Sequence, residues 1–464
     1  MARKKTKNPE KSYQIFWWIV ALLVVLFIVA GVFFFSSGDY LIFENILWVF
    51  RYLWWLILPF PAWLIFMTVW MEYAEFSFAS KGKFILLEIR PPRETEKSPK
   101  IMEQVFAGMH SWSAPNKFEK YCGWRPLQDK YTFEIVSIEG TVRFFVRCPV
   151  AAKNNVEAQI YAHYPDAEIF EAEDYTLKVP RNLPNKDWDV WGTSLTLLKD
   201  DVVPIRVYKY FQEDVTGNMI DPLASMTEAM SQIGKNEHMW FQIIFTPAYE
   251  PDWVPAAKQK LEEIKEEFAG NKKVAKMGRV EKFFLGFGRL ISNIFRGIVG
   301  SELNLSPLDK GEDKKNEFNV QRLRPAQQDL LKAIEENIAK PGFWTSMRYV
   351  YIGKKDGSFN KALGVAGFMG AIKQLADNNL NSLVPNNATK TFANYYFSEP
   401  RLQYRQRKIV GDYKDRAFQG TQFLFNIEEL ATVFHFPDVS VKTPAIQRIE
   451  AKKGDAPFNL PVVE

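Results

Sequence analysis

Two long apolar runs near the amino terminus set the first part of the chain apart from the rest. Residues 15–35 contain no charged side chain. At 1.5 Å rise per residue such a helix is about 30 Å long, which matches the hydrocarbon thickness of a bilayer. A second apolar stretch, 46–71, carries Arg51 near its start and Pro59 and Pro61 in its middle. We predict two transmembrane helices, 15–35 and 46–71, of which the second either spans or re-enters the bilayer.

The distribution of charge around these runs predicts their orientation. The basic segment 1–14 carries five Lys and Arg residues, whereas the loop between the runs has Asp39 and Glu44 but no Lys or Arg. Basic residues return after the second run, at Lys81 and Lys83. Cytoplasmic loops are enriched in Lys and Arg, so we expect both termini and the main body on the cytoplasmic side of the cell (inner or plasma) membrane. A cleaved signal peptide is the competing interpretation, but the first run is long for one.

From residue 80 onward, short strand-like runs alternate with helical ones. In the first set, 80–178, the expected order is strand, helix, strand, hairpin strand, helix, strand, which is typical of a ferredoxin-like (split βαβ) domain. The expected strands are 83–90, 131–138, 141–148 and 167–170, and the expected helices are 99–112 and 150–163. This part therefore predicts an α+β fold.

A second set of strand and helix patterns, 189–425, follows a proline-bearing boundary. Its expected strands are 203–211, 238–246 and 343–352, and its expected helices are 221–233, 253–268, 325–339 and 359–376. We predict a second ferredoxin-like domain, split by an insertion at 269–319. The similar element order suggests an internal duplication.

The insertion contains a basic amphipathic pattern. Seven basic residues and one acidic residue lie in 272–296, and apolar residues there recur at helical spacing. Such a helix is able to lie on an anionic membrane surface, and the alternative is that its apolar face packs on the body. The candidate membrane-surface residues are Lys282, Phe283, Phe284, Phe287, Arg289, Ile291 and Arg296.

Composition and motifs exclude several classes of function. With 47% hydrophobic and 24% charged residues, the chain is neither wholly disordered nor a polytopic transporter, and two Cys exclude a disulfide scaffold. A P-loop requires Gly-Lys followed by Ser or Thr, but the pairs that begin at Gly82, Gly234 and Gly353 lack it. The four His residues have no metal-ligand spacing. We therefore expect no enzyme, no catalytic residue, no cofactor and no bound metal.

A second basic cluster is interleaved with tyrosines in 401–416. Bases and rings in such a pattern are suited to a nucleic-acid backbone or an acidic partner. The more ordinary interpretation is a solvated basic run. The candidate contact residues are Arg401, Arg405, Arg407, Lys408, Lys414 and Arg416.

The segment 421–463 resembles the region that precedes the motor in HerA/TraG-like ATPases of conjugative transfer and type IV secretion. The residues that carry the resemblance are Asn426, Glu428, Glu429, Leu430, Ala431, His435, Pro437, Thr443, Pro444, Lys452, Lys453, Pro457, Leu460 and Pro461. Three earlier segments, EIRPPRETEKSPKIMEQVFAGMH, FEIVSIEGTVRFFVRCP and EAQIYAHYPDAEI, are also similar to the amino-terminal region of this family. The resemblance covers most of 80–464, and 426–464 matches the helix and linker before the motor.

This resemblance implies a function that involves no catalysis. We expect a non-catalytic inner-membrane anchor and adaptor subunit of a conjugation or type IV secretion-like apparatus. It would recruit a separate cytosolic P-loop ATPase, contact the lipid bilayer and assemble as a homo-oligomer. The expected docking residues are Asn426, Glu428, Glu429, Leu430, His435, Pro437, Thr443 and Pro444. The alternative is a membrane-tethered module that binds DNA or anionic lipid.

Overall fold

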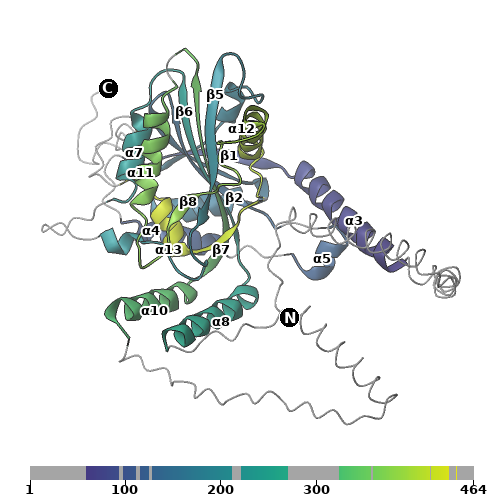
Figure 1. Ribbon diagram of the computed structural model, residues 1–464, viewed down its shortest axis with the longest axis vertical. Coiled ribbons are helices and arrows are strands. Elements are labelled where there is room, and N and C mark those ends of the chain that lie inside the picture. Colours follow the sequence, from purple (N-terminus) through teal and green to yellow (C-terminus); the bar gives the residue numbers. More distant parts are fainter. Residues whose placement is uncertain are drawn as a thin grey trace, which may run out of the picture.

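A single antiparallel sheet of nine strands organises the protein (Figure 1). The computed structural model describes residues 59–92, 98–110, 115–124, 128–211, 221–269, 323–356, 359–418, 420–437 and 446. The strands are β1 (Phe84–Arg90), β2 (Tyr131–Ile138), β3 (Thr141–Pro149), β4 (Glu168–Glu171), β5 (Trp188–Leu197), β6 (Glu237–Pro247), β7 (Gly342–Lys354), β8 (Leu383–Pro385) and β9 (Phe423–Asn426). Their spatial order is β4-β1-β3-β2-β6-β7-β5-β8, and β9 pairs with β7. The fold class is α+β.

The two halves of this sheet repeat one strand order. The first half runs β4-β1-β3-β2, and the second, followed from its outer edge, runs β8-β5-β7-β6. They join where β2 pairs with β6, from Tyr131 opposite Phe245 to Ile138 opposite His238. Every residue of β6 is buried, so this junction lies inside one continuous sheet. The prediction of two separate ferredoxin-like domains is therefore wrong, because alternation identifies strands but not the edges along which they pair.

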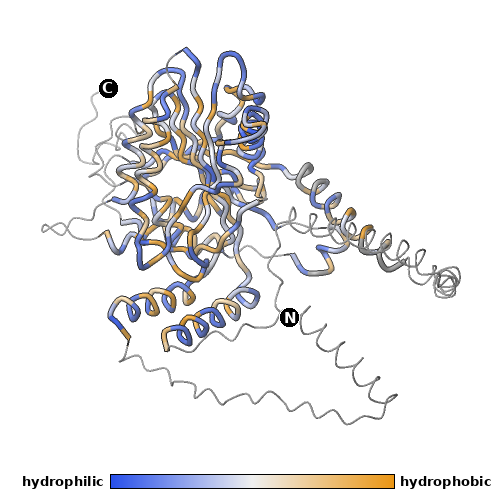
Figure 2. Tube along the Cα trace, viewed as in Figure 1, coloured by the Kyte–Doolittle hydropathy of each residue, from blue (hydrophilic) through white to orange (hydrophobic). Residues whose placement is uncertain are grey.

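Helices cover both faces of the sheet. On one face α4, α6, α7, α11 and α13 pack over the main hydrophobic core, and on the other α12 packs over a smaller one. The helices are α3 (Pro59–Lys81), α4 (Lys100–Met109), α5 (Lys117–Tyr121), α6 (Lys153–His163), α7 (Ala224–Ser231), α8 (Glu250–Phe268), α10 (Pro325–Ile338), α11 (Phe368–Lys373), α12 (Ser398–Lys414) and α13 (Ile427–Val433). Shorter helical turns are η1 (Val150–Ala152), η2 (Tyr175–Lys178), η3 (Tyr208–Phe211) and the π-helical η5 (Ala362–Gly367). Figure 2 shows hydrophobic residues concentrated along the strands and hydrophilic residues at the turns.

The strand predicted at 203–211 is also wrong. Part of it forms η3, and the backbone N–H groups of Ile205 and Tyr208 donate to the side chains of Glu429 and Thr432, each over 3.0 Å. Backbone donors that are used in this way are not free for a strand ladder. The strand that fills the second half is β5, whose first residues overlap the predicted boundary between domains.

No helix in the described ranges is long and apolar enough to cross a membrane. The described part of the predicted span 46–71 lies in α3 (Pro59–Lys81), which does not meet this requirement. Within the described residues, this finding contradicts the predicted transmembrane helices and the membrane localisation that rested on them. The basic segment 1–14, the span 15–35 and residues 46–58 lie outside the described residues.

Candidate interaction surfaces

Six of the eight docking residues expected from the resemblance lie in α13 and its flanks, and these six are buried. Asn426 caps the helix: its side chain accepts from the Glu429 N–H while Glu429 accepts from the Asn426 N–H, a reciprocal capping box. Glu428, Leu430, His435 and Pro437 are buried as well, and Thr443 and Pro444 lie outside the described residues. A partner has no access to this helix in the folded protein.

Ionisable side chains fix α13 to the sheet and its neighbours. Glu428 pairs with Lys209 (2.7 Å) and with Lys340. His435 Nε2 lies 2.9 Å from Asp221 Oδ1. Burial raises the pKa of Glu429 to about 8, although two backbone N–H groups donate to its carboxyl. The described residues that carry the resemblance, from Asn426 to Pro437, therefore serve the interior of the fold.

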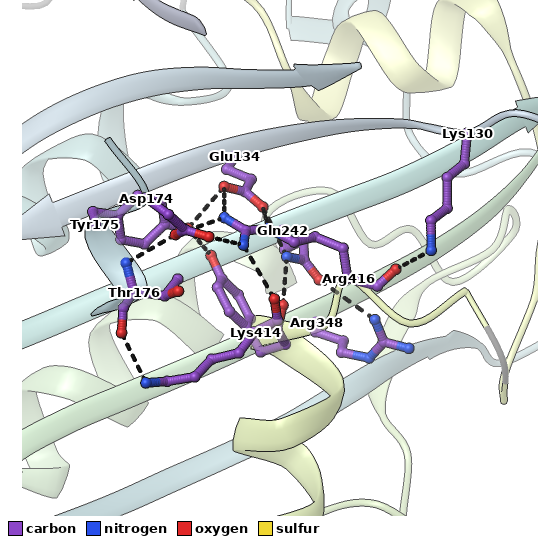
Figure 3. Close-up of polar contacts among 10 residues, drawn as sticks. Lys130, Glu134, Asp174, Tyr175, Thr176, Gln242, Arg348, Lys414 and Arg416 are labelled. Carbon is purple, nitrogen blue, oxygen red and sulfur yellow. Dashed lines mark hydrogen bonds and ion pairs between the residues drawn. The ribbon is translucent and has the colours of Figure 1, made fainter. Parts of the chain in front are cut away.

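On the opposite face, a buried polar network holds the carboxyl-terminal end of α12 (Figure 3). Arg416 Nε donates to Glu134 Oε1 on β2 over 3.1 Å, and Arg416 Nη2 donates to Asp174 Oδ1 over 3.1 Å. Gln242 on β6 donates both to Glu134 Oε1 (2.8 Å) and to the Tyr413 carbonyl (3.1 Å). The side chains of Arg416 and Glu134 are 2% and 0% exposed, so their charges compensate each other away from water.

Two tyrosines and two lysines complete this network. The Tyr175 hydroxyl donates to Glu134 Oε2 (2.9 Å), so the Tyr413 hydroxyl, 2.8 Å away, donates to Tyr175. Lys414 Nζ donates to the Thr176 carbonyl over 2.8 Å. Burial, together with three neighbouring guanidinium groups, lowers the pKa of Lys130 to about 8. Lys414 and Arg416, predicted to contact nucleic acid or an acidic partner, anchor α12 in the structure.

The remaining basic residues of that predicted set divide between two roles. Arg401 Nη1 donates to the Asn394 carbonyl (3.3 Å), and Arg405 Nη1 donates to the Lys390 carbonyl (3.2 Å). Both guanidinium groups thus hold the segment that precedes α12. Arg407 and Lys408 are exposed on the helix.

That segment, residues 391–397, is here named the aromatic loop. Its Tyr395, Tyr396 and Phe397 side chains are 89%, 88% and 79% exposed. Tyr395 and Phe397 have positive φ values of 67° and 54°, a left-handed conformation that is costly for bulky residues. Thr391 fixes the start of the loop, because its hydroxyl accepts from the Gly192 N–H (2.9 Å) and its N–H donates to the Gly192 carbonyl (3.0 Å). Three adjacent rings are therefore held out in solvent on an anchored backbone.

A groove of about 800 Å³ adjoins the aromatic loop. Its walls come from the start of β5, the aromatic loop and the amino-terminal half of α12. The lining residues are Pro184, Asn185, Lys186, Asp189, Val190, Trp191, Lys355, Lys361, Thr391, Phe392, Ala393, Glu399, Leu402, Gln403 and Gln406. The sequence pattern missed this site, although three consecutive aromatic residues without strand or helix period are a signal that was present.

A second exposed apolar surface lies on α3, which projects from the body (Figure 1). Trp63, Phe66, Trp70 and Tyr73 follow steps of 3, 4 and 3 residues, and successive ring centroids lie 5.9, 6.3 and 6.1 Å apart. This row of rings is here named the α3 aromatic row. Trp63, Phe66 and Tyr73 are 60%, 55% and 62% exposed, and Trp70 Nε1 donates to the Tyr121 carbonyl over 3.0 Å. A continuous exposed apolar row of this kind is typical of a protein-binding helix.

In the part of the chain that the structure describes, no group of three His, Cys, Asp or Glu side chains is placed to hold a metal. Burial raises the pKa of the Cys148 thiol to about 12, so it stays protonated at neutral pH. His238 stacks on Trp188, with ring centroids 5.7 Å apart. The candidate membrane-surface residues Lys282, Phe283, Phe284, Phe287, Arg289, Ile291 and Arg296 lie outside the described residues.

Comparison with known proteins gives one family. No curated protein sequence matches the chain. The profile of a family described as Domain of unknown function (DUF8128) matches residues 72–449, which is most of the chain and includes the sheet, α12 and α13. The protein therefore belongs to the DUF8128 family.

Proposed function

We propose that this chain is a non-catalytic adaptor that recruits a separate P-loop ATPase, and that α3 is its docking element. The observation that carries the proposal is the α3 aromatic row, which exposes several rings on a helix that stands away from the sheet. Ile65 and Val69, which are 49% and 56% exposed, widen the apolar surface beside it. Burying such side chains against a partner releases water from a large apolar area.

The spacing of the row suits a helical partner. Steps of 3 and 4 residues place side chains along one seam of a helix, which is the pattern by which two helices pack together. The identity of the partner rests on the resemblance of 421–463 to the segment before the motor of HerA/TraG-like ATPases. Because α13 is buried, we assign the docking role to α3 instead of the residues around Asn426.

Co-purification tests the proposal. The tagged full chain is co-expressed with a HerA/TraG-like ATPase that lacks its own amino-terminal region, and the bound fraction is measured after capture. We expect Trp63→Ser/Phe66→Ser to reduce the bound ATPase by at least about tenfold, since each lost ring removes a large apolar contact. The matched control is Leu177→Ser/Leu198→Ser, which removes two side chains that are 81% and 65% exposed elsewhere on the surface.

Three results would contradict the proposal. The first is capture of no ATPase by the wild-type chain, and the second is equal capture by the Trp63→Ser/Phe66→Ser variant. The third comes from light scattering of the chain alone: a dimer that the same variant abolishes would mean that α3 binds a second copy instead of an ATPase.

A further inference from the structure

The aromatic loop differs from an ordinary exposed apolar patch because its backbone is fixed at several points. Thr391 bonds Gly192 through both its hydroxyl and its N–H, and Arg401 and Arg405 donate to carbonyls within or beside the loop. The buried network around Arg416 holds the helix that follows. The rings of Tyr395, Tyr396 and Phe397 are thus presented on a pre-organised support, which lowers the entropic cost of binding a ligand.

Cations line the groove that adjoins the aromatic loop. Lys186, Lys355 and Lys361 are exposed and line the adjoining groove. Lys390 Nζ lies 5.6 Å from the centroid of the Phe392 ring, whose side chain is 55% exposed.

The acidic residues of the groove are already engaged. Glu399 Oε1 accepts from Gln403 Nε2 over 3.1 Å. Asp189 Oδ1 accepts from Gln406 Nε2 (3.0 Å) and from the Val190 N–H (2.8 Å). Three lysines against two hydrogen-bonded carboxylates leave the groove with a positive balance, which favours an anionic ligand.

We propose that the aromatic loop and its groove bind single-stranded nucleic acid, an activity separate from the docking of an ATPase on α3. Exposed rings stack on the faces of unpaired bases, and the neighbouring cations contact the phosphates. In a duplex the base faces are covered by their neighbours in the stack, so the rings would have no surface to contact. An acidic peptide would satisfy the lysines but would not use three adjacent rings.

Fluorescence anisotropy of a labelled oligothymidylate tests this with the full chain. We expect the logarithm of the binding constant to fall linearly with the logarithm of the salt concentration between about 50 and 200 mM, as phosphate contacts require. The variant Tyr395→Ser/Tyr396→Ser should raise Kd by about tenfold or more, since two stacked bases lose their platforms. The control is Tyr249→Ser, which removes a ring that is 58% exposed on another surface.

A charge series completes the experiment. Lys355→Gln and Lys361→Gln should each reduce the salt slope by about 0.7, whereas Lys258→Gln on the exposed side of α8 should leave it unchanged. Circular dichroism confirms that each variant is folded.

Any of four outcomes overturns the proposal. The wild-type chain does not bind the oligonucleotide at about 50 mM salt, or it binds a duplex or polyglutamate with equal affinity. The fourth is a Tyr395→Ser/Tyr396→Ser variant that binds the oligonucleotide like wild type. The variant Trp63→Ser/Phe66→Ser should bind the oligonucleotide normally, so this test fails or succeeds independently of the ATPase proposal.

Discussion

The α3 aromatic row and the aromatic loop both expose several rings, but their supports differ. The row lies on a regular helix, where Trp70 donates a hydrogen bond to the Tyr121 carbonyl and no ring position holds a lysine or arginine. The loop is irregular, is anchored by Thr391 and two arginines, and is bordered by lysines. An apolar row on a helix suits another helix, whereas rings among cations suit a polyanion. Exposure of aromatic residues alone therefore does not define a partner, and the charges and anchors around them do.

Among the predicted changes, removal of the Arg416–Glu134 ion pair that anchors α12 should lower the stability of the protein most. In Arg416→Met, Glu134 stays buried without its cation, and we expect the free energy of unfolding to fall by about 3–5 kcal/mol. Urea denaturation measures this loss, and Arg407→Met, at an exposed position of the same helix, is the control. If both variants unfolded at similar urea concentrations, the network would not be what supports the aromatic loop.

Acid should weaken the sheet through His238, which stacks on Trp188 of β5. Burial lowers the pKa of His238 to about 4 from 6.5, so the unfolded chain binds the proton more tightly. The stability due to the neutral ring is present above pH 6.5 and is lost as the pH falls toward 4, by up to about 3 kcal/mol. His238→Phe should flatten this part of the curve of unfolding free energy against pH. If the curve of His238→Phe were as steep as that of the wild type, His238 would not be the source of the acid dependence.

The smallest effect is expected where only the loop is loosened. Thr391→Val removes the hydroxyl that accepts from the Gly192 N–H, and should cost about 1–2 kcal/mol of stability. Oligonucleotide affinity should fall a few-fold because the rings are less well fixed. Thr391→Ser keeps the hydroxyl and serves as the control, and capture of the ATPase through α3 should be unchanged in both. A loss of capture in Thr391→Val would mean that the two surfaces are not separate.

Most of the strands and helices were predictable because their patterns are local. The runs around β1, β2, β3, β6 and β7 are apolar and lie close to the predicted ranges. β5 was missed because Gly192, Thr193 and Ser194 interrupt its apolar run, although its neighbours bury all three. The apparent strand at 203–211 failed for the opposite reason, since side chains of α13 take its backbone donors.

The candidate site was less accessible to sequence reasoning. In the sequence, Arg407 and Arg416 are two basic residues of one run. In the structure, Arg407 is exposed, whereas Arg416 is buried against Glu134, 282 positions earlier in the chain. Nothing in a local window distinguishes the two, because the difference lies in the partner and not in the residue.

The sequence by itself determined the α+β class and most of the strands, because periodicity depends on residues within a few positions of one another. Only the tertiary structure decided that both halves form one sheet, that the residues resembling a docking helix are buried, and that the aromatic loop is exposed. Those outcomes depend on pairing between strands and on charges brought together from distant positions, which no local pattern encodes.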